Sequence, residues 1–263
     1  MKDEAKRREL SENPGQLEGR NALTEALKNG RTIDKVFIAA GETDRSLQHL
    51  ASQAKAVGAV VIPTDRRKLD AISVTHAHQG VIAFAAAKEY VTLDEILEEA
   101  QRRGEPPLLV ICDELSDPHN LGAILRSAEC AGAHGVVIPK RRSVGLTAVV
   151  AKASAGAVEY MKVARVSNLT AAIEELKKKG VWVFGTAAEG SVPMYQADLT
   201  VPAAIVIGSE GDGMSRLVRE SCDVTVHIPM KGRITSLNAS TAASVLLYEA
   251  VRQRLGNQEG YHG

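Results

Sequence analysis

Short apolar runs alternate with helical patterns over the C-terminal part of the chain. Runs of this length suit strands that are buried on both faces of a parallel sheet. The runs are residues 108–113, 135–139, 181–187, 203–209 and 224–229. Helical spacing of apolar positions is found at 120–131, 168–179, 214–221 and 237–254. The alternation predicts a doubly wound α/β domain over residues 108–256.

The preceding part of the chain has the pattern of a second, smaller α/β unit over residues 16–88. Helical spacing at 19–30 and 44–57 alternates with strand-like runs at 35–40, 59–64 and 80–86. Residues 89–107 are expected to form a linker helix with one narrow apolar stripe, which Gly104 and Pro106–Pro107 end. Residues 1–15 and 257–263 are expected to be polar tails.

The composition is that of a globular protein. Hydrophobic residues make up 44% of the 263 residues and charged residues 24%, which excludes a disordered chain. No apolar run approaches the roughly 18 residues of a membrane span, and the first ten residues lack the apolar segment of a secretory signal. The three cysteines are widely spaced without a CxxC pair, which disfavours a disulfide framework or a zinc cluster. We therefore expect a cytoplasmic protein without a metal.

The charge balance weakens a nucleic-acid interpretation without removing it. Lys and Arg number 32, and Asp and Glu also number 32, so the net charge is zero. A small basic patch can nevertheless sit on a neutral protein. Aromatic residues are only 3%, which disfavours a protein that grips single strands mainly by base stacking.

The usual nucleotide-binding loops of an α/β sheet are missing. No GxGxxG follows residues 108–113, and no GxxxxGK[ST] occurs anywhere in the sequence. These absences disfavour a dinucleotide-dependent dehydrogenase, a P-loop ATPase and a methyltransferase with the common glycine-rich loop.

Three other segments stand at the carboxyl ends of predicted strands, where open α/β sheets bind ligands. In residues 117–126, Asn120 lies at a helix start and Arg126 points away from the apolar stripe. In residues 208–213, three glycines would let the backbone approach a ligand closely or adopt positive φ, with Glu210 beside the opening. In residues 227–240, a polar loop that contains Ser236 and Asn238 precedes a long helix.

Each segment also has an ordinary structural interpretation. Asn120, Ser236 or Asn238 could simply cap a helix, and Arg126 could be a solvated side chain. The glycine segment could be a tight turn with Glu210 near a helix N-terminus.

Basic runs offer weaker signals for nucleic acid. Most such runs are solvated faces, and the run at 177–179 ends a predicted helix. Arg141 and Arg142 follow a strand end on the same edge as the three motifs, so they are the better candidates for contact with RNA.

Taken together, the three motifs resemble the SpoU (TrmH-type) branch of the SPOUT RNA methyltransferases. The match is carried by DPHNLGAILRSAECAG from Asp117, IVIGSEGDGMS from Ile205, and HIPM from His227 followed by SLNASTAASVLLYEA. GRNALTEAL at 19–27 and HQGVIA at 78–83 are similar to the substrate-binding domain of that family, and residues 141–159 to its intervening segment. The resemblance covers about residues 16–256, and it is strongest to members that methylate a guanosine of 23S ribosomal RNA.

The resemblance implies a SPOUT domain with a deep trefoil knot, a homodimer with active sites at the subunit interface, and S-adenosylmethionine as the methyl donor. The family pattern places the cofactor-binding residues at Thr186, Gly208, Ile228, Met230 and Leu237. It places the polar active-site residues at Asn120, Arg126, Glu210, Ser236 and Asn238.

The implied reaction transfers a methyl group to a ribose 2′-hydroxyl and requires no metal. A guanidinium stays protonated in proteins, so we do not expect Arg126 to be a general base. We expect Arg126 to bind the reacting phosphate–ribose unit and to stabilise developing charge, while Glu210 or a water takes the proton.

The N-terminal unit is expected to select the RNA by shape. Arg20 and Asn21 are candidate RNA contacts, although a role at the start of a helix fits both equally well. Large-subunit ribosomal RNA is the preferred substrate and transfer RNA the alternative, with ribosomal protection against an antibiotic as a third option. Two other classes stay open: a non-catalytic RNA-binding assembly factor and a nucleotide-dependent oxidoreductase.

Overall fold

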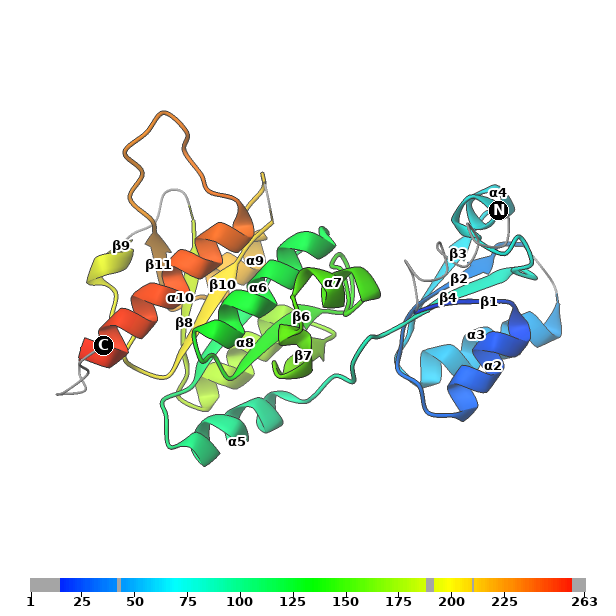
Figure 1. Ribbon diagram of the computed structural model, residues 1–263, viewed down its shortest axis with the longest axis horizontal. Helices are drawn as coiled ribbons and strands as arrows, with labels where there is room; N and C mark the ends of the chain where they lie inside the picture. The colour runs from blue at the N-terminus through cyan, green and yellow to red at the C-terminus, as the bar shows by residue number, and fades with distance from the viewer. Residues whose placement is uncertain (1–14, 42–43, 188–191, 210, 257–263) are drawn as a thin grey trace. The chain divides into compact units, whose positions relative to one another are not determined.

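The computed structural model describes residues 15–41, 44–187, 192–209 and 211–256, so both expected tails lie almost wholly outside it. The described chain forms two compact units (Figure 1). The smaller unit contains the described residues up to Glu89 together with Gly145–Ala151. The larger unit contains Tyr90–Val144 and the described residues from Lys152 onward.

The larger unit is built on a parallel sheet of seven strands in the order β7-β6-β5-β10-β8-β11-β9. Five of these strands match the predicted runs: β5 (Leu108–Cys112), β6 (Gly135–Pro139), β8 (Trp182–Thr186), β10 (Ala203–Ile207) and β11 (Val224–His227). The pattern missed β7 (Val163–Val166) and β9 (Val192–Pro193). Every residue of β5 and of β10 is buried, which explains why these strands read as continuous apolar runs.

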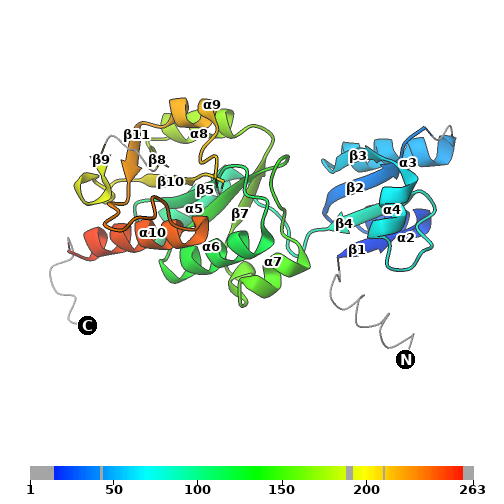
Figure 2. The same ribbon diagram turned by 90° about the horizontal axis from the view of Figure 1, so that it is seen from above.

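Helices cover both faces of this sheet (Figure 2). One face carries α5 (Leu93–Arg103), α8 (Leu169–Lys178) and α9 (Arg216–Ser221), and the other carries α6 (Pro118–Cys130) and α10 (Ala239–Gly256). Shorter pieces of this unit are η1 (Ala157–Glu159) and η2 (Met194–Gln196), while α7 (Ala148–Ala153) begins in the segment Gly145–Ala151 that belongs to the smaller unit. The larger unit is therefore the predicted doubly wound α/β domain, while the trefoil knot that the resemblance implies stays a prediction.

Helix α5 is the helix that the sequence pattern placed between the two domains. Thr92 and Glu95 form a reciprocal capping box at its start, and Gly104 ends it in the left-handed conformation. Its apolar residues Leu93 and Ile96 are buried in the core of the larger unit. This packing makes α5 part of the sheet domain's own structure.

Helix α10 is held firmly at its C-terminal end. The Arg254 guanidinium donates hydrogen bonds of 2.6–3.0 Å to the carbonyl oxygens of Pro106, Pro107, Leu199 and Val201. These oxygens belong to the segments that lead into β5 and β10, so Arg254 fixes the helix against the amino-terminal edge of the sheet. No described helix is both long and apolar enough to cross a membrane.

The smaller unit is a four-stranded mixed sheet in the order β1-β4-β2-β3. β4 (Val81–Ala85) runs antiparallel to β1 (Gln16–Glu18) and β2 (Ile33–Ala39), and β2 runs parallel to β3 (Val60–Thr64). The helices are α2 (Arg20–Lys28), α3 (Arg45–Ala56) and α4 (Arg66–Ile72). The sequence pattern missed β1, which has three residues and no apolar run, and α4, which buries only Leu69.

The carboxylate of Glu18 anchors the short strand β1 to the segment that follows α4. It accepts hydrogen bonds from Ser73 Oγ at 2.7 Å, from the Val74 backbone N–H at 2.6 Å, and from the backbone and side chain of Thr75. Burial by itself raises the pKa of Glu18, but the bonds from Thr75, Ser73 and Val74 outweigh it and lower the pKa to about 2. The ionised carboxylate therefore stabilises the small unit.

We expect Glu18→Gln to lower the stability of the protein at pH 7, because an amide accepts these hydrogen bonds less strongly than a carboxylate. Glu18 is only half-buried, so we expect a loss of about 1–2 kcal/mol, in the lower part of the range for bonds to a charged group. The native pKa lies below the ordinary value of 4.5. The stabilisation is therefore complete above pH 4.5 and is lost as the pH falls toward about 2.

Thermal unfolding of the full chain between pH 7 and pH 3 measures this effect. The difference between wild type and variant should narrow as the pH falls. An equal difference at both ends of that range would show that the charge on Glu18 does not stabilise the fold.

Candidate active site

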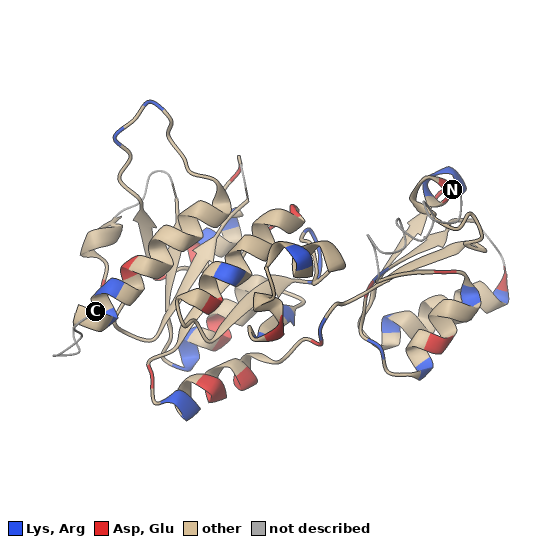
Figure 3. Ribbon diagram, viewed as in Figure 1, with Lys and Arg blue, Asp and Glu red and all other residues tan. Residues whose placement is uncertain are grey.

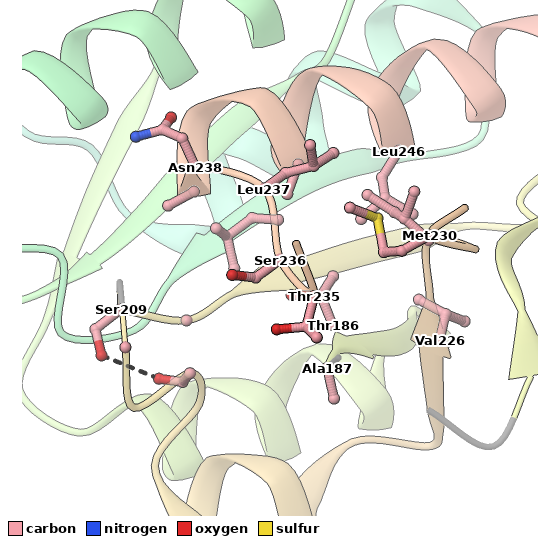
Figure 4. Close-up of a pocket in the computed structure, with 17 residues that line it drawn as sticks. Thr186, Ala187, Ser209, Val226, Met230, Thr235, Ser236, Leu237, Asn238 and Leu246 are labelled. Carbon is pink, nitrogen blue, oxygen red and sulfur yellow. Dashed lines mark hydrogen bonds between the residues drawn. The ribbon is translucent and has the colours of Figure 1, made fainter. Parts of the chain in front are cut away.

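A cavity of about 360 Å³ opens at the carboxyl edge of the seven-stranded sheet (Figure 4). Its walls come from the ends of three neighbouring strands, β8, β10 and β11, and from the first turns of α10. The strand ends contribute Thr186, Ala187, Ile207, Gly208, Val226 and Ile228, and the helix contributes Ala239, Ala242 and Leu246. This is the edge at which open α/β sheets bind ligands.

Strand register places these ends side by side. In the parallel pairing, Ile207 lies opposite Cys112 and Val206 lies opposite Gly185. The Asp113 N–H donates to the Ile207 carbonyl at 2.8 Å, and Thr186 Oγ1 donates to the Val206 carbonyl at 2.7 Å. The floor of the cavity is therefore fixed by backbone pairing and by a side chain bonded to that backbone.

The glycine-rich segment after β10 forms a tight loop beside the cavity. Ser209 and Gly213 exchange backbone hydrogen bonds of 2.9 and 3.1 Å, and Ser209 Oγ donates to the Gly213 carbonyl at 3.2 Å. A Cβ atom at Gly208 would lie 2.2 Å from the Gly213 carbonyl carbon and 2.3 Å from the Met214 nitrogen. Gly211 and Gly213 adopt the positive φ expected as one use of these glycines. Gly208 lines the cavity, and its missing side chain also leaves room for the chain's own backbone.

Asp113 anchors the far end of this loop, and the sequence analysis did not single it out. Its side chain is buried and accepts a hydrogen bond of 2.7 Å from the Ser215 backbone N–H. Buried carboxylates are rare unless they are paired or hydrogen-bonded. The sequence signal that could have identified Asp113 is its position, an acidic residue directly after a strand whose residues are all apolar.

Asn238 directly precedes α10, and both the oxygen and the nitrogen of its side-chain amide form hydrogen bonds. Its Oδ1 accepts bonds from the Ser240 N–H at 3.0 Å, the Thr241 N–H at 3.3 Å and Ser240 Oγ at 2.6 Å, so it caps α10. Its Nδ2 donates to Asn120 Oδ1 at 2.9 Å. Asn120 is itself only 5% exposed, in the first turn of α6.

A second polar contact joins the same two helices. Ser127 Oγ and Ser244 Oγ lie 2.7 Å apart, one on α6 and one on α10. Because both contacts pair residues in the same order along the chain, the two helices run side by side in the same direction. The entrance of the cavity is therefore positioned by α6 as well as by the strands.

The structure brings together most of the residues that the sequence motifs predicted for this site. All five expected cofactor residues line the cavity: Thr186, Gly208, Ile228, Met230 and Leu237. Ser236 and Asn238 also line it, and Asn120 contacts Asn238. Their functional roles stay predictions.

Two expected active-site residues are placed differently. Arg126 is exposed on α6 and is not among the described residues that line the cavity. Glu210 lies outside the described residues, although its neighbours Ser209 and Gly211 line the cavity.

The candidate RNA contacts differ in whether their side chains already form hydrogen bonds or ion pairs within the protein. Arg20 Nε donates to the Gln79 carbonyl at 3.2 Å, and its guanidinium forms an ion pair with Asp44. Arg142 forms an ion pair of 3.1 Å with Glu114. Asn21 and Arg141 are exposed. Arg20 therefore has the structural role at a helix start that the sequence left open, and contact with RNA stays a prediction for all four.

The cavity is electrically neutral along its described walls, because none of its lining residues is acidic or basic. Two thiols lie at the ends of elements of this domain, Cys112 at the end of β5 and Cys222 directly after α9. Burial, together with the charge of Asp113, raises the pKa of Cys112 to about 12. Burial, together with the charge of Asp223, raises the pKa of Cys222 to about 11. Both thiols are therefore protonated at neutral pH, and neither is a nucleophile.

Comparison with known proteins identifies two family models in this chain. The model of the SpoU rRNA methylase family matches residues 107–248. The model for RNA 2′-O ribose methyltransferase substrate binding matches residues 16–91. The two matches correspond to the sheet domain that carries the cavity and to the smaller α/β unit.

Similar proteins share nearly the full length of the chain. A Bacillus subtilis protein, YacO, which is assigned to the TrmH family of tRNA/rRNA methyltransferases, is 49% identical over 90% of this chain and 94% of its own. The 23S rRNA (guanosine-2′-O-)-methyltransferase RlmB of Ralstonia nicotianae is 47% identical over 90% of this chain and 95% of its own.

Solved structures show the same fold. The SpoU methyltransferase AviRb from Streptomyces viridochromogenes, in complex with AdoMet, has a TM-score of 0.59 and 27% identity over 92% of each chain. An AdoMet-bound rRNA methyltransferase from Sinorhizobium meliloti has a TM-score of 0.56 and 25% identity, over 93% of this chain and 89% of its own. On the family-model match and the identity to its relatives, this chain belongs to the SpoU rRNA methylase family.

Proposed function

We propose that this protein is an S-adenosylmethionine-dependent methyltransferase that modifies the ribose 2′-hydroxyl of a guanosine in 23S ribosomal RNA. The observation that carries the proposal is the cavity at the carboxyl edge of the sheet, which gathers seven of the ten predicted site residues. The relative RlmB supports the guanosine and ribosomal assignment. The cysteine pattern favours the cytoplasm as the place of this reaction.

The cavity has the size and character to hold the proposed methyl donor. Its volume of about 360 Å³ lies within the range of roughly 300–1,000 Å³ typical of small-molecule sites. Apolar walls from Ile228, Leu237 and Leu246 alternate with the hydroxyls of Thr186 and Ser236. Bound there, S-adenosylmethionine would supply a methyl group that is already activated by its sulfonium.

The protein's own task is then to orient the ribose and to handle one proton. A bond forms between the 2′-oxygen and the methyl carbon, the carbon–sulfur bond breaks with its electron pair left on sulfur, and the hydroxyl proton passes to a base. Orientation of the reacting partners can contribute several kcal/mol, about 7–11 in the best intramolecular cases. Ser236 and Asn238 lie in the cavity wall and would hold the ribose.

Asn120 would act through Asn238. Asn120 is buried behind the cavity wall and accepts a hydrogen bond from the Asn238 amide. That bond fixes which way Asn238 presents its amide, so we assign Asn120 as a positioning residue. Glu210 or a water is proposed to take the proton, because Ser209 and Gly211 on either side of Glu210 line the cavity.

Arg126 is proposed to serve the cavity of a second copy in a homodimer. It is exposed on α6, outside the described cavity lining of its own chain. Its planar guanidinium would bind the phosphate next to the reacting ribose, where a bidentate contact gives both charge and orientation.

Transfer RNA is the second candidate substrate. The observation that favours it is the high identity to YacO, whose TrmH family includes both tRNA and rRNA methyltransferases by name. The cavity and the proposed chemistry would be the same, and only the selection of RNA would differ.

Gly208→Ala should weaken S-adenosylmethionine binding by about tenfold or more. A Cβ at this position would meet the Gly213–Met214 backbone, and relieving such overpacking costs about 1–3 kcal/mol by displacing the loop beside the cavity. Isothermal titration calorimetry measures the Kd. Gly256→Ala is the matched control, because a Cβ there meets no atom within 4 Å. An unchanged Kd in Gly208→Ala would show that this loop does not contribute to the binding of S-adenosylmethionine.

Arg126→Lys should lower kcat for methyl transfer by at least tenfold while the Kd for S-adenosylmethionine stays unchanged, because lysine cannot form the planar fork.

The proposed dimer adds a complementation test. At an S-adenosylmethionine concentration well below the Kd of Gly208→Ala, Arg126→Ala and Gly208→Ala chains should each keep about a tenth of wild-type activity or less. When the two are mixed by unfolding and refolding together, activity should rise to about a quarter of wild type, since half of random dimers are mixed and each has one complete site. No recovery would place Arg126 in its own chain's site.

The proposed function itself is tested by transfer of a tritiated methyl group. The protein and labelled S-adenosylmethionine are incubated separately with unmodified 23S ribosomal RNA and unmodified transfer RNA, and the product is digested with alkali. Alkali-resistant labelled dinucleotides that contain guanosine, found in ribosomal RNA, are expected. Label only in transfer RNA would make transfer RNA the substrate in place of ribosomal RNA. The absence of both label and cofactor binding would favour a non-catalytic RNA-binding factor.

A further inference from the structure

The loop between β11 and α10 is both a wall of the cavity and an exposed surface. We call residues 229–238 the β11–α10 loop. Every residue from Met230 to Asn238 is exposed, with Ile234 at 73%. Met230 and residues 235–238 also line the cavity. The loop extends away from the sheet and helices around it (Figure 1), so a molecule bound at the entrance would contact it.

Two positive charges lie on this loop without a counter-charge. Lys231 and Arg233 are exposed, and neither has an ion pair or a hydrogen bond with a described residue. The loop contains no acidic residue (Figure 3). Some other basic side chains of this domain are neutralised locally: Lys177 pairs with Asp223 at 3.0 Å, and Arg252 pairs with Glu249 at 2.8 Å.

The positions of Lys231 and Arg233 indicate which kind of anionic partner they could bind. Neither Lys231 nor Arg233 is among the described residues of the cavity lining, so they do not face a ligand held inside it. The described walls of the cavity carry no charge of their own. An anionic partner that enters the cavity with one group and leaves the rest outside would therefore meet its charge complement on this loop.

We propose that Lys231 and Arg233 bind backbone phosphates of the substrate RNA beside the nucleotide whose 2′-hydroxyl enters the cavity. This inference rests on the proposed function, since it names RNA as the partner. A nucleotide within a strand has a phosphate on each side of its ribose, both outside a pocket that takes only that ribose. Phosphate contacts fix register and orientation without reading sequence. The two residues are therefore positioning residues, while selection of the nucleotide lies elsewhere.

The test is the salt dependence of RNA binding. Each phosphate neutralised by a cation contributes about 0.7–0.9 to the slope of log K against log[salt]. Lys231→Ala and Arg233→Ala should each reduce the slope by about one and raise the KM for RNA. The double variant should reduce the slope by about two. Binding of an unmodified 23S ribosomal RNA transcript is measured by filter retention between about 50 and 200 mM NaCl.

Three variants control for effects other than charge at this place. Lys178→Ala removes one exposed cation at the end of α8, which precedes β8 and so lies at the opposite edge of the sheet, and it should leave the slope unchanged. Arg233→Lys keeps the charge and should keep the slope. Arg233→Glu should weaken binding more than Arg233→Ala at low salt. Calorimetry with S-adenosylmethionine should give the wild-type Kd for each variant, which verifies the fold and the cavity.

The outcomes separate this inference from the proposed function. If the wild type methylates RNA and the double variant keeps its slope and KM, the inference is wrong and the function stands. A double variant with the wild-type slope but a changed sedimentation coefficient would assign the loop to contact with a second copy and would also overturn the inference. If the wild type neither binds nor methylates RNA while it binds S-adenosylmethionine, both proposals are wrong.

Discussion

The parallel pairing of β10 with β5 on one side and β8 on the other is the constraint on which the site depends. It sets Ile207 opposite Cys112 and Val206 opposite Gly185, so the next residues of three strands come together at one edge. Those residues are Asp113, Gly208 and Thr186. Asp113 anchors the glycine loop, Gly208 leaves room for the backbone of that loop, and Thr186 lies in the cavity wall. Helix α10 closes the cavity because Asn120 holds its first turn and Arg254 its last.

The sequence predicted the parts of this arrangement that have a strong local signal. β5 and β10 are buried at every residue, so each reads as an unbroken apolar run. The long helices α6 and α10 carry regular apolar spacing. The expected cofactor residues were found differently, through motifs whose resemblance to a family pointed to Thr186, Gly208, Ile228, Met230 and Leu237. All five line one cavity because parallel strands deliver their carboxyl ends to the same edge.

The remaining features depend on contacts that a single sequence does not encode locally. β9 has two residues and β1 has three, so neither shows a period. The pairing of Asn120 with Asn238 joins residues 118 positions apart, and the capping role that the sequence allowed for each gave no indication of this contact. In the structure Asp117, not Asn120, caps α6. Gly208 has a further requirement that the sequence did not indicate, because the backbone that a Cβ would meet belongs to Gly213 and Met214, five and six positions later.

The distribution of the cavity along the chain has a consequence for synthesis. The four strands of the smaller unit are complete by Ala85, whereas the cavity needs residues as far along as Leu246. A chain made from its N-terminus can therefore pair the strands of its smaller unit while the other domain is still emerging, since domains fold as units in the order of translation. The cavity is among the last features to form. A chain that ends before α10 lacks part of the cover on one face of the sheet and one wall of the cavity.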